Sequence, residues 1–144
     1  MPLTLRSLTE PAAKLAIVAP VFNDWSCVGS LIAGLEGTSG LPADTTLFLV
    51  DDGSTETMPT QIPTGIIPVE VIRLGANIGH QRAIAVGLVR IAKTKFADVV
   101  IVIDADGEDL PADCQLLWQT HVANQSAVIV AQRLKRNESA RFKL

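Results

Sequence analysis

The chain has 144 residues, enough for one domain with a sizeable core and too few for two ordinary domains. Its 48% hydrophobic and 19% charged residues are typical of a folded globular protein and exclude an intrinsically disordered one. The net charge of -3 does not indicate a nucleic-acid partner. No apolar run approaches the roughly 20 residues that span a bilayer, and no signal-peptide pattern opens the chain. We therefore expect a soluble, cytoplasmic chain that can still contact the inner face of a membrane.

Short unbroken apolar runs alternate along the chain with segments of helical periodicity. In chain order the predicted elements are a strand at 14–20, a helix at 24–37, strands at 46–52 and 69–74, a helix at 77–95, a strand at 98–104, a helix with Pro111 in its first turn, and a strand at 127–133. Residues 1–13 are expected to form a leader before a single domain over residues 14–144. The alternation predicts an α/β fold with a mostly parallel β-sheet and helices on both faces.

Helical periodicity also predicts which side chains face the sheet. Asp24 or Ser26 is expected to cap the first helix and Gly37 to end it. A glycine in the apolar stripe of the second helix should allow close packing against the sheet. The inward-facing residues are predicted to be Ile84, Gly87, Leu88 and Ile91 in the second helix, and Cys114, Leu117 and Trp118 in the third. Cys27 and Cys114 form no CxxC motif, so both are expected to be reduced core thiols.

Polar motifs stand where three of the predicted strands end. They are "APVFND" after the first strand, "DDGS" after the second and "DADGED" after the fourth, while Arg133 takes the same place on the fifth. Each motif alone is also typical of a solvated turn. Ligands of open parallel sheets bind outside the carboxyl ends of the strands, so three such ends on one edge predict a binding site.

The acidic motif after the fourth strand indicates a divalent cation. In an extended segment, Asp104 and Asp106 point to the same side because side-chain direction alternates. Paired carboxylates suit Mg²⁺ or Mn²⁺, which prefer oxygen ligands and leave room for phosphate oxygens. Glu108, two residues further on, is a candidate third ligand. A cation here would offset the repulsion between the carboxylates and hold a diphosphate.

Other phosphate-handling designs agree less well with the sequence. A P-loop and a dinucleotide-binding glycine motif are both missing from the sequence. A haloacid-dehalogenase-like phosphatase with Asp104 as nucleophile shares the "DADG" pattern, but its motif continues differently from Glu108 and Asp109 and lies on the first strand. A response-regulator receiver would need an acid on the first strand. A non-catalytic nucleotide-binding module remains an alternative.

Together these motifs resemble the family 2 glycosyltransferases, which have a GT-A nucleotide-sugar-binding fold. The similarity is greatest to the branch of dolichyl- and polyprenyl-phosphate sugar transferases, and it extends from Lys14 onward. The matching segments, in family order, are "LAIVAPVFND", "LFLVDDGST", "VIRLGANIGHQRAIAVGL", "VVIVIDADGEDLP" and "VIVAQR".

The resemblance implies a role for each matching residue. Phe22 stands where the family commonly has Tyr, and Glu108 where this branch commonly has Gln. The implied nucleotide-sugar site comprises Pro20, Phe22 and Asp24 lining the nucleotide, Asp51 near the base and ribose with Asp52 shaping the turn, Asn77 and Gly79 opening the long helix, Asp104, Ala105 and Asp106 as the D-x-D motif, and Arg133 at the diphosphate.

The resemblance also implies a reaction. A sugar would pass, with inversion, from a UDP-, GDP- or dTDP-linked donor to an acceptor such as a polyprenyl phosphate, with Mg²⁺ or Mn²⁺ as cofactor, in cell-wall or glycolipid biosynthesis. The acceptor half and the general base are expected beyond Leu144, so the chain is interpreted as a donor-binding portion truncated after the fifth strand. It is expected to be either a fragment of a longer enzyme or a natural short relative, and not to complete transfer efficiently by itself. His80 and His121 are expected to be structural. The basic tail, with Arg136, Arg141 and Lys143, is expected to face solvent or an anionic lipid.

Overall fold

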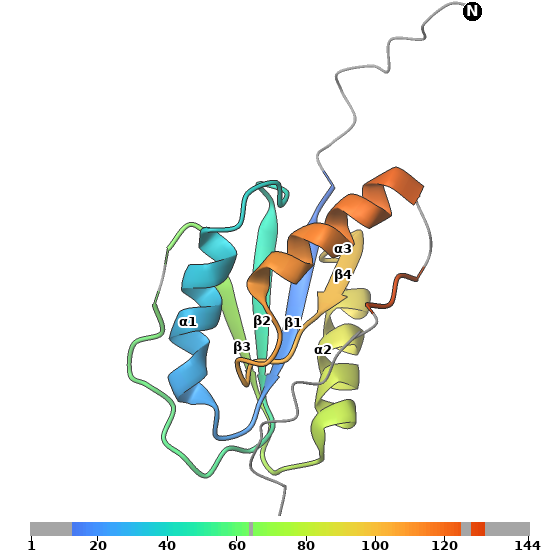
Figure 1. The fold of residues 1–144 in the computed structure, drawn as a ribbon. Helices are drawn as coiled ribbons and strands as arrows, with labels where there is room; N and C mark the ends of the chain where they lie inside the picture. Colours follow the sequence, from blue (N-terminus) through green and yellow to red (C-terminus); the bar gives the residue numbers. More distant parts are fainter. Residues whose placement is uncertain (1–12, 64, 125–127, 132–144) are drawn as a thin grey trace, which may run out of the picture.

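The computed structural model describes residues 13–63, 65–124 and 128–131 of the chain (Figure 1). Strands and helices alternate as the apolar periodicity predicted. The elements are β1 (Leu15–Val21), α1 (Trp25–Glu36), β2 (Thr45–Asp51), β3 (Val69–Arg73), α2 (His80–Thr94), β4 (Val99–Val102) and α3 (Pro111–Asn124).

The described strands form one parallel sheet in the order β3-β2-β1-β4. Every residue of β1 and β2 is buried, which explains why both read as unbroken apolar runs. The outer strands β3 and β4 are only partly buried. Because all the strands are parallel, their carboxyl ends meet at a single edge of the sheet.

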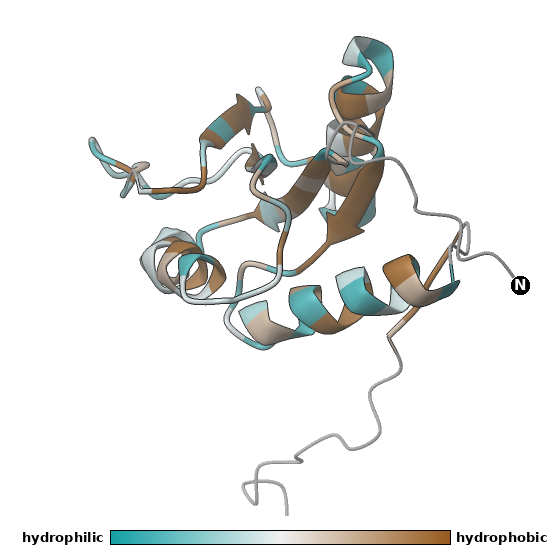
Figure 2. Cartoon of the chain, turned by 90° about the horizontal axis from the view of Figure 1, so that it is seen from above, coloured by the Kyte–Doolittle hydropathy of each residue, from teal (hydrophilic) through white to brown (hydrophobic). Residues whose placement is uncertain are grey.

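Helices cover both faces of the sheet, as expected. One apolar cluster joins the sheet to α1 and α3, and a second, smaller cluster joins it to α2. Figure 2 shows α1 and α3 on one side of the strands and α2 on the other. The α/β architecture with a parallel sheet is therefore confirmed.

The inward face of α2 differs in part from the prediction. Ala83, Gly87 and Ile91 are its buried residues, whereas Leu88 is 38% exposed. The buried residues are spaced four apart and form the face of α2 that packs on β1 and β2. Leu88 lies beside this face and lines a second cavity next to β4. The predicted close packing at Gly87 is confirmed, because a Cβ there would lie 2.8 Å from Val18 Cγ1.

β4 is shorter than the predicted fourth strand by one residue at its start and two at its end. It ends at Val102, and the chain bends from Ala105 onward instead of staying extended through Asp104. The Asp109 carboxylate accepts a hydrogen bond from the Asp104 backbone N–H at 3.0 Å, and Gly107 has a φ of 87°. These features form a tight acidic loop in place of the end of a strand.

The predicted fifth strand is not found where it can be checked. Residues 128–131 are described and are not in a strand. The leader, Arg133 and the basic tail lie outside the described residues, so the predictions about them stay predictions. Among the residues that the structure describes, no helix combines the length and apolar composition needed to cross a bilayer.

Candidate functional site

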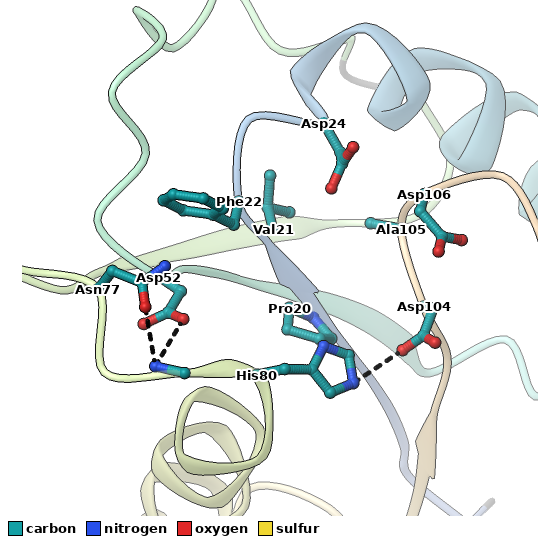
Figure 3. Close-up of a pocket in the computed structure, with 11 residues that line it drawn as sticks. Pro20, Val21, Phe22, Asp24, Asp52, Asn77, His80, Asp104, Ala105 and Asp106 are labelled. Atoms are coloured by element: carbon teal, nitrogen blue, oxygen red, sulfur yellow. Dashed lines mark hydrogen bonds and ion pairs between the residues drawn. The ribbon is translucent and has the colours of Figure 1, made fainter.

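A cavity of about 350 Å³ opens at the carboxyl ends of the strands, where the polar motifs were predicted to meet. Its size is in the range of small-molecule sites. It is lined by Pro20, Val21, Phe22, Asp24, Asp52, Asn77, Gly79, His80, Asp104, Ala105 and Asp106 (Figure 3). These residues come from the ends of β1 and β2, the start of α2 and the loop after β4, so segments far apart in sequence share one site.

The cavity gathers all the predicted nucleotide contacts except Asp51 and Arg133. Arg133 lies outside the described residues. Asp51 is buried behind the rim, where its carboxylate accepts the Ser54 backbone N–H at 2.9 Å and lies 3.5 Å from Arg73 Nε. Its predicted contact with a base or ribose therefore stays a prediction.

The end of β1 supplies an aromatic ring and a carboxylate. Phe22 is 42% exposed, an unusual exposure for a phenyl ring, and it stands at the cavity wall. Asp24 takes the N-cap position of α1, as one prediction had it, but its side chain makes no capping hydrogen bond. Figure 3 shows the Asp24 carboxylate over the cavity. This wall therefore offers an apolar surface for a planar ring and an acceptor for polar groups on a ligand.

Asp52 holds the loop that leads into α2. Asp52 is only 2% exposed. Its two carboxylate oxygens accept the backbone N–H groups of Ile78 at 2.7 Å and Gly79 at 3.0 Å. The Asn77 side-chain oxygen also accepts the Gly79 N–H, at 3.1 Å. Asp52 thus fixes the Asn-x-Gly turn, and Gly79 adopts a φ of 93° that favours glycine.

The D-x-D motif lies on the bent loop after β4. Asp104 and Asp106 both line the cavity, although the extended geometry predicted for them is wrong. Asp106 Oδ1 accepts the Glu108 backbone N–H at 2.8 Å, which makes a local turn. Glu108 is exposed and lies outside the set of residues that line the cavity.

His80, which we expected to be structural, faces the cavity from the first position of α2. Its Nε2 lies 3.2 Å from Asp104 Oδ1, and both side chains are partly exposed (Figure 3). Among the described residues that line the cavity, His80 is the one basic side chain. It connects the start of α2 to the loop after β4.

The acidic residues of the cavity are those on which the prediction of a divalent cation depends, and that cation stays a prediction. Within the described ranges, no three His, Cys, Asp or Glu side chains lie close enough to form a ligand set by themselves. Asp104 and Asp106 nevertheless line the same cavity, and Mg²⁺ is commonly held by one or two carboxylates plus substrate phosphates. The donor chemistry therefore agrees with a cation that completes its shell with phosphate oxygens and water.

Sequence reasoning missed two further residues near the site. Cys27, predicted to be a core thiol, is only partly buried, and its thiol donates to the Asp106 backbone carbonyl at 3.6 Å. Asn23 joins the loop after β1 to the loop after β2 through its side chain. The one feature of the sequence that could have indicated a role for Asn23 is its position between the predicted site residues Phe22 and Asp24. Cys114 is buried as predicted.

Comparison with known proteins agrees with this geometry. A match to "Glycosyl transferase family 2" covers residues 16–143. Curated relatives include the undecaprenyl-phosphate 4-deoxy-4-formamido-L-arabinose transferases of Yersinia pestis (strain Pestoides F) and Yersinia pseudotuberculosis serotype O:3 (strain YPIII). Each is 30% identical over 140 residues, which cover 92% of this chain and 41% of the relative. The chain thus spans about two fifths of the length of these relatives. The family match over most of its length shows that this chain belongs to glycosyl transferase family 2.

Proposed function

We propose that this chain binds a nucleotide diphosphate sugar, together with Mg²⁺ or Mn²⁺, as the donor site of a glycosyltransferase. The observation that carries the proposal is the cavity itself, in which an exposed aromatic ring and the two D-x-D carboxylates line one space. An apolar platform suits a nucleobase, and paired carboxylates suit a cation that holds a diphosphate. Family membership favours sugar transfer over the phosphatase alternative.

The wall formed by Phe22 and Asp24 would receive the nucleoside. Base stacking on an aromatic side chain contributes about 1–3 kcal/mol and tolerates different bases. Phe22 lacks a hydroxyl, so its contribution would come from the face of the ring. The Asp24 carboxylate would accept hydrogen bonds from the nucleoside, and the Asn77 side-chain amide would donate them. Asp51, behind them, would support this end through the turn that it anchors.

The wall formed by Asp104 and Asp106 would receive the diphosphate. Carboxylates repel phosphate oxygens, so an anionic ligand needs a positive charge between them. A bound divalent cation supplies that charge and stabilises the leaving diphosphate. The N-terminus of α2 lies at the cavity, and its partial positive charge adds to the attraction. Glu108 and Arg133 are proposed to contribute a further metal ligand and a diphosphate contact.

We further propose a lipid phosphate as the acceptor. The relatives described above are named undecaprenyl-phosphate 4-deoxy-4-formamido-L-arabinose transferases, and the similarity covers 92% of this chain. A phosphate acceptor is already anionic and scarcely needs a general base. Such an acceptor would place the site next to the inner face of a membrane, where the basic tail would meet anionic lipid.

Isothermal titration calorimetry with UDP-, GDP- and dTDP-sugars, with and without Mn²⁺, tests donor binding. We expect one nucleotide class to bind in a Mn²⁺-dependent way. Asp106→Asn should raise its Kd at least tenfold, which corresponds to about 1.4 kcal/mol of binding free energy. Asp44→Asn is the matched control, because Asp44 is an exposed acid at the opposite edge of the sheet, paired with Lys14. Binding by none of the three classes, or metal-independent binding that survives Asp106→Asn, would contradict the proposal.

Transfer is tested separately from binding. Radiolabelled sugar transfer from the bound nucleotide class to undecaprenyl phosphate in detergent micelles is the direct assay. Transfer by this chain supports the complete proposal. Donor hydrolysis or sugar transfer by this chain would exclude the non-catalytic nucleotide-binding module.

A further inference from the structure

Asn23 lies between Phe22 and Asp24, and its side chain reaches the loop after β2. Its backbone N–H donates to Ser54 Oγ at 3.0 Å, and its Nδ2 donates to Thr55 Oγ1 at 3.0 Å. Its Oδ1 accepts the backbone N–H groups of Thr55 at 2.9 Å and Glu56 at 3.0 Å. One side chain and one amide therefore join two loops that are more than 30 positions apart in sequence.

The backbone conformation of Asn23 also favours asparagine over most other residues. Its φ of 61° lies in the left-handed region, which asparagine adopts more readily than most residues. This conformation reverses the chain direction directly after β1. Phe22 and Asp24 flank the reversal, and both line the cavity. The direction of these two side chains thus depends on the turn that Asn23 holds.

The contacts continue into β2. The Ser54 N–H donates to Asp51 Oδ1 at 2.9 Å, and the Asp52 N–H donates to the Val21 carbonyl at 2.8 Å. The loop after β1 is therefore tied to the second strand by both side-chain and backbone bonds. The D-x-D loop has partners outside this set of bonds, among them Asp109, His80 and Cys27.

From this arrangement we infer that Asn23 is a positioning residue for the nucleoside end of the site, acting through Phe22 and Asp24. The inference rests on the proposed function, because it names which part of the donor depends on this contact. Loss of the Asn23 side chain should weaken nucleoside recognition and leave the cation and diphosphate end intact.

Three variants separate the side chain from the backbone turn. Asn23→Gly keeps the left-handed turn and removes the side-chain bonds. Asn23→Asp keeps an oxygen that accepts the Thr55 and Glu56 N–H groups. Asn23→Ala removes the side chain and also strains the turn. Circular dichroism and thermal unfolding first establish that each variant is folded, and Asn23→Ala replaces Asn23→Gly in the comparison if the Gly variant is not.

Amide hydrogen exchange, followed by NMR, measures in the absence of ligand whether the Thr55 and Glu56 N–H groups are bonded to Asn23. Thr55 and Glu56 are exposed residues, so their amide protection should depend on Asn23. We expect protection to fall at least tenfold in Asn23→Gly and to be largely kept in Asn23→Asp. The Ile78 amide, which is bonded to Asp52, is the internal control and should not change. Unchanged protection of Thr55 and Glu56 in Asn23→Gly would overturn the inference.

Calorimetry then reads the functional consequence. With Mn²⁺ present, the Kd of the tightest of UDP, GDP and dTDP should rise about tenfold in Asn23→Gly and recover in Asn23→Asp. The Kd of Mn²⁺-pyrophosphate should stay within twofold of wild type. Equal nucleotide affinity in Asn23→Gly and wild type would overturn the positioning role. A wild-type chain that binds no nucleotide but keeps its amide protection would overturn the proposed function, and the positioning role with it.

Discussion

Replacing Asp52 with asparagine tests how the site loop before α2 is held. The residue is only 2% exposed, and each carboxylate oxygen accepts one backbone N–H, from Ile78 and from Gly79. An asparagine at this position keeps one oxygen. Its amide group must then face one of the two N–H groups, so two donors meet where a donor and an acceptor met before.

The expected cost follows from these two bonds. A hydrogen bond to a charged group contributes about 1.5–3 kcal/mol, whereas a neutral one contributes about 0.5–1.5 kcal/mol. Asp52→Asn weakens the first bond and loses the second, and Asn77 still accepts the Gly79 N–H, which limits the loss. We expect the free energy of unfolding to fall by about 2–4 kcal/mol, which for a chain of this size lowers Tm by roughly 4–16 °C.

Urea and thermal unfolding followed by circular dichroism measure this change. Asp44→Asn makes the same chemical substitution at an exposed position and should stay within about 0.5 kcal/mol of wild type. Donor affinity should fall as well in Asp52→Asn, because Asn77, Gly79 and His80 line the cavity from the released loop. An unfolding free energy for Asp52→Asn equal to that of Asp44→Asn would refute the reasoning.

Two further predictions concern a ring and the thiols. Phe22→Ala should raise the Kd of the nucleotide sugar roughly 5- to 150-fold, because base stacking contributes about 1–3 kcal/mol, and Phe22→Tyr should leave the Kd unchanged. Calorimetry measures both values, and a Tyr variant that binds as poorly as the Ala variant would argue against stacking. Burial, with nearby Asp113 and Asp109, raises the pKa of the Cys114 thiol from 9.0 to about 12, so a thiol reagent at pH 8 should label Cys27 and spare Cys114 until the chain unfolds. Rapid labelling of both thiols in the native chain would contradict the burial of Cys114. Because the thiol is deprotonated at lower pH in the unfolded chain than in the folded one, the free energy of unfolding should also fall as the pH rises from about 9 toward 12. Cys114→Ala should reduce that fall.

The proposed site explains why several buried or strained features are kept together at one edge of the sheet. The left-handed Asn23, the positive φ of Gly79 and the bend at Gly107 all occur in loops that surround the cavity. Unusual backbone conformations of this kind commonly accompany binding sites, where side-chain direction matters more than local stability. Here Gly79 lines the cavity itself, and Asn23 and Gly107 each stand next to a residue that lines it.

The sequence by itself determined the order of the elements, the parallel sheet and the edge on which the site would lie. Apolar periodicity is a local property, so it marked β1 and β2 as buried strands and placed Asp104 and Asp106 at the carboxyl end of the fourth strand. The family motifs added most of the residues that line the cavity. These predictions needed only short segments and the rule that parallel strands end at one edge.

Only the tertiary structure decided which partners each polar group takes. Asn23 and Thr55 are 32 positions apart, and Asp52 and Gly79 are 27 apart, yet each pair is within hydrogen-bond distance. The bend after β4, the approach of His80 to Asp104 and the outward turn of Leu88 also depend on how separate elements pack. Hydrogen-bond partners are set by loop conformations and by the distances between elements, and no repeating pattern in the sequence encodes either one.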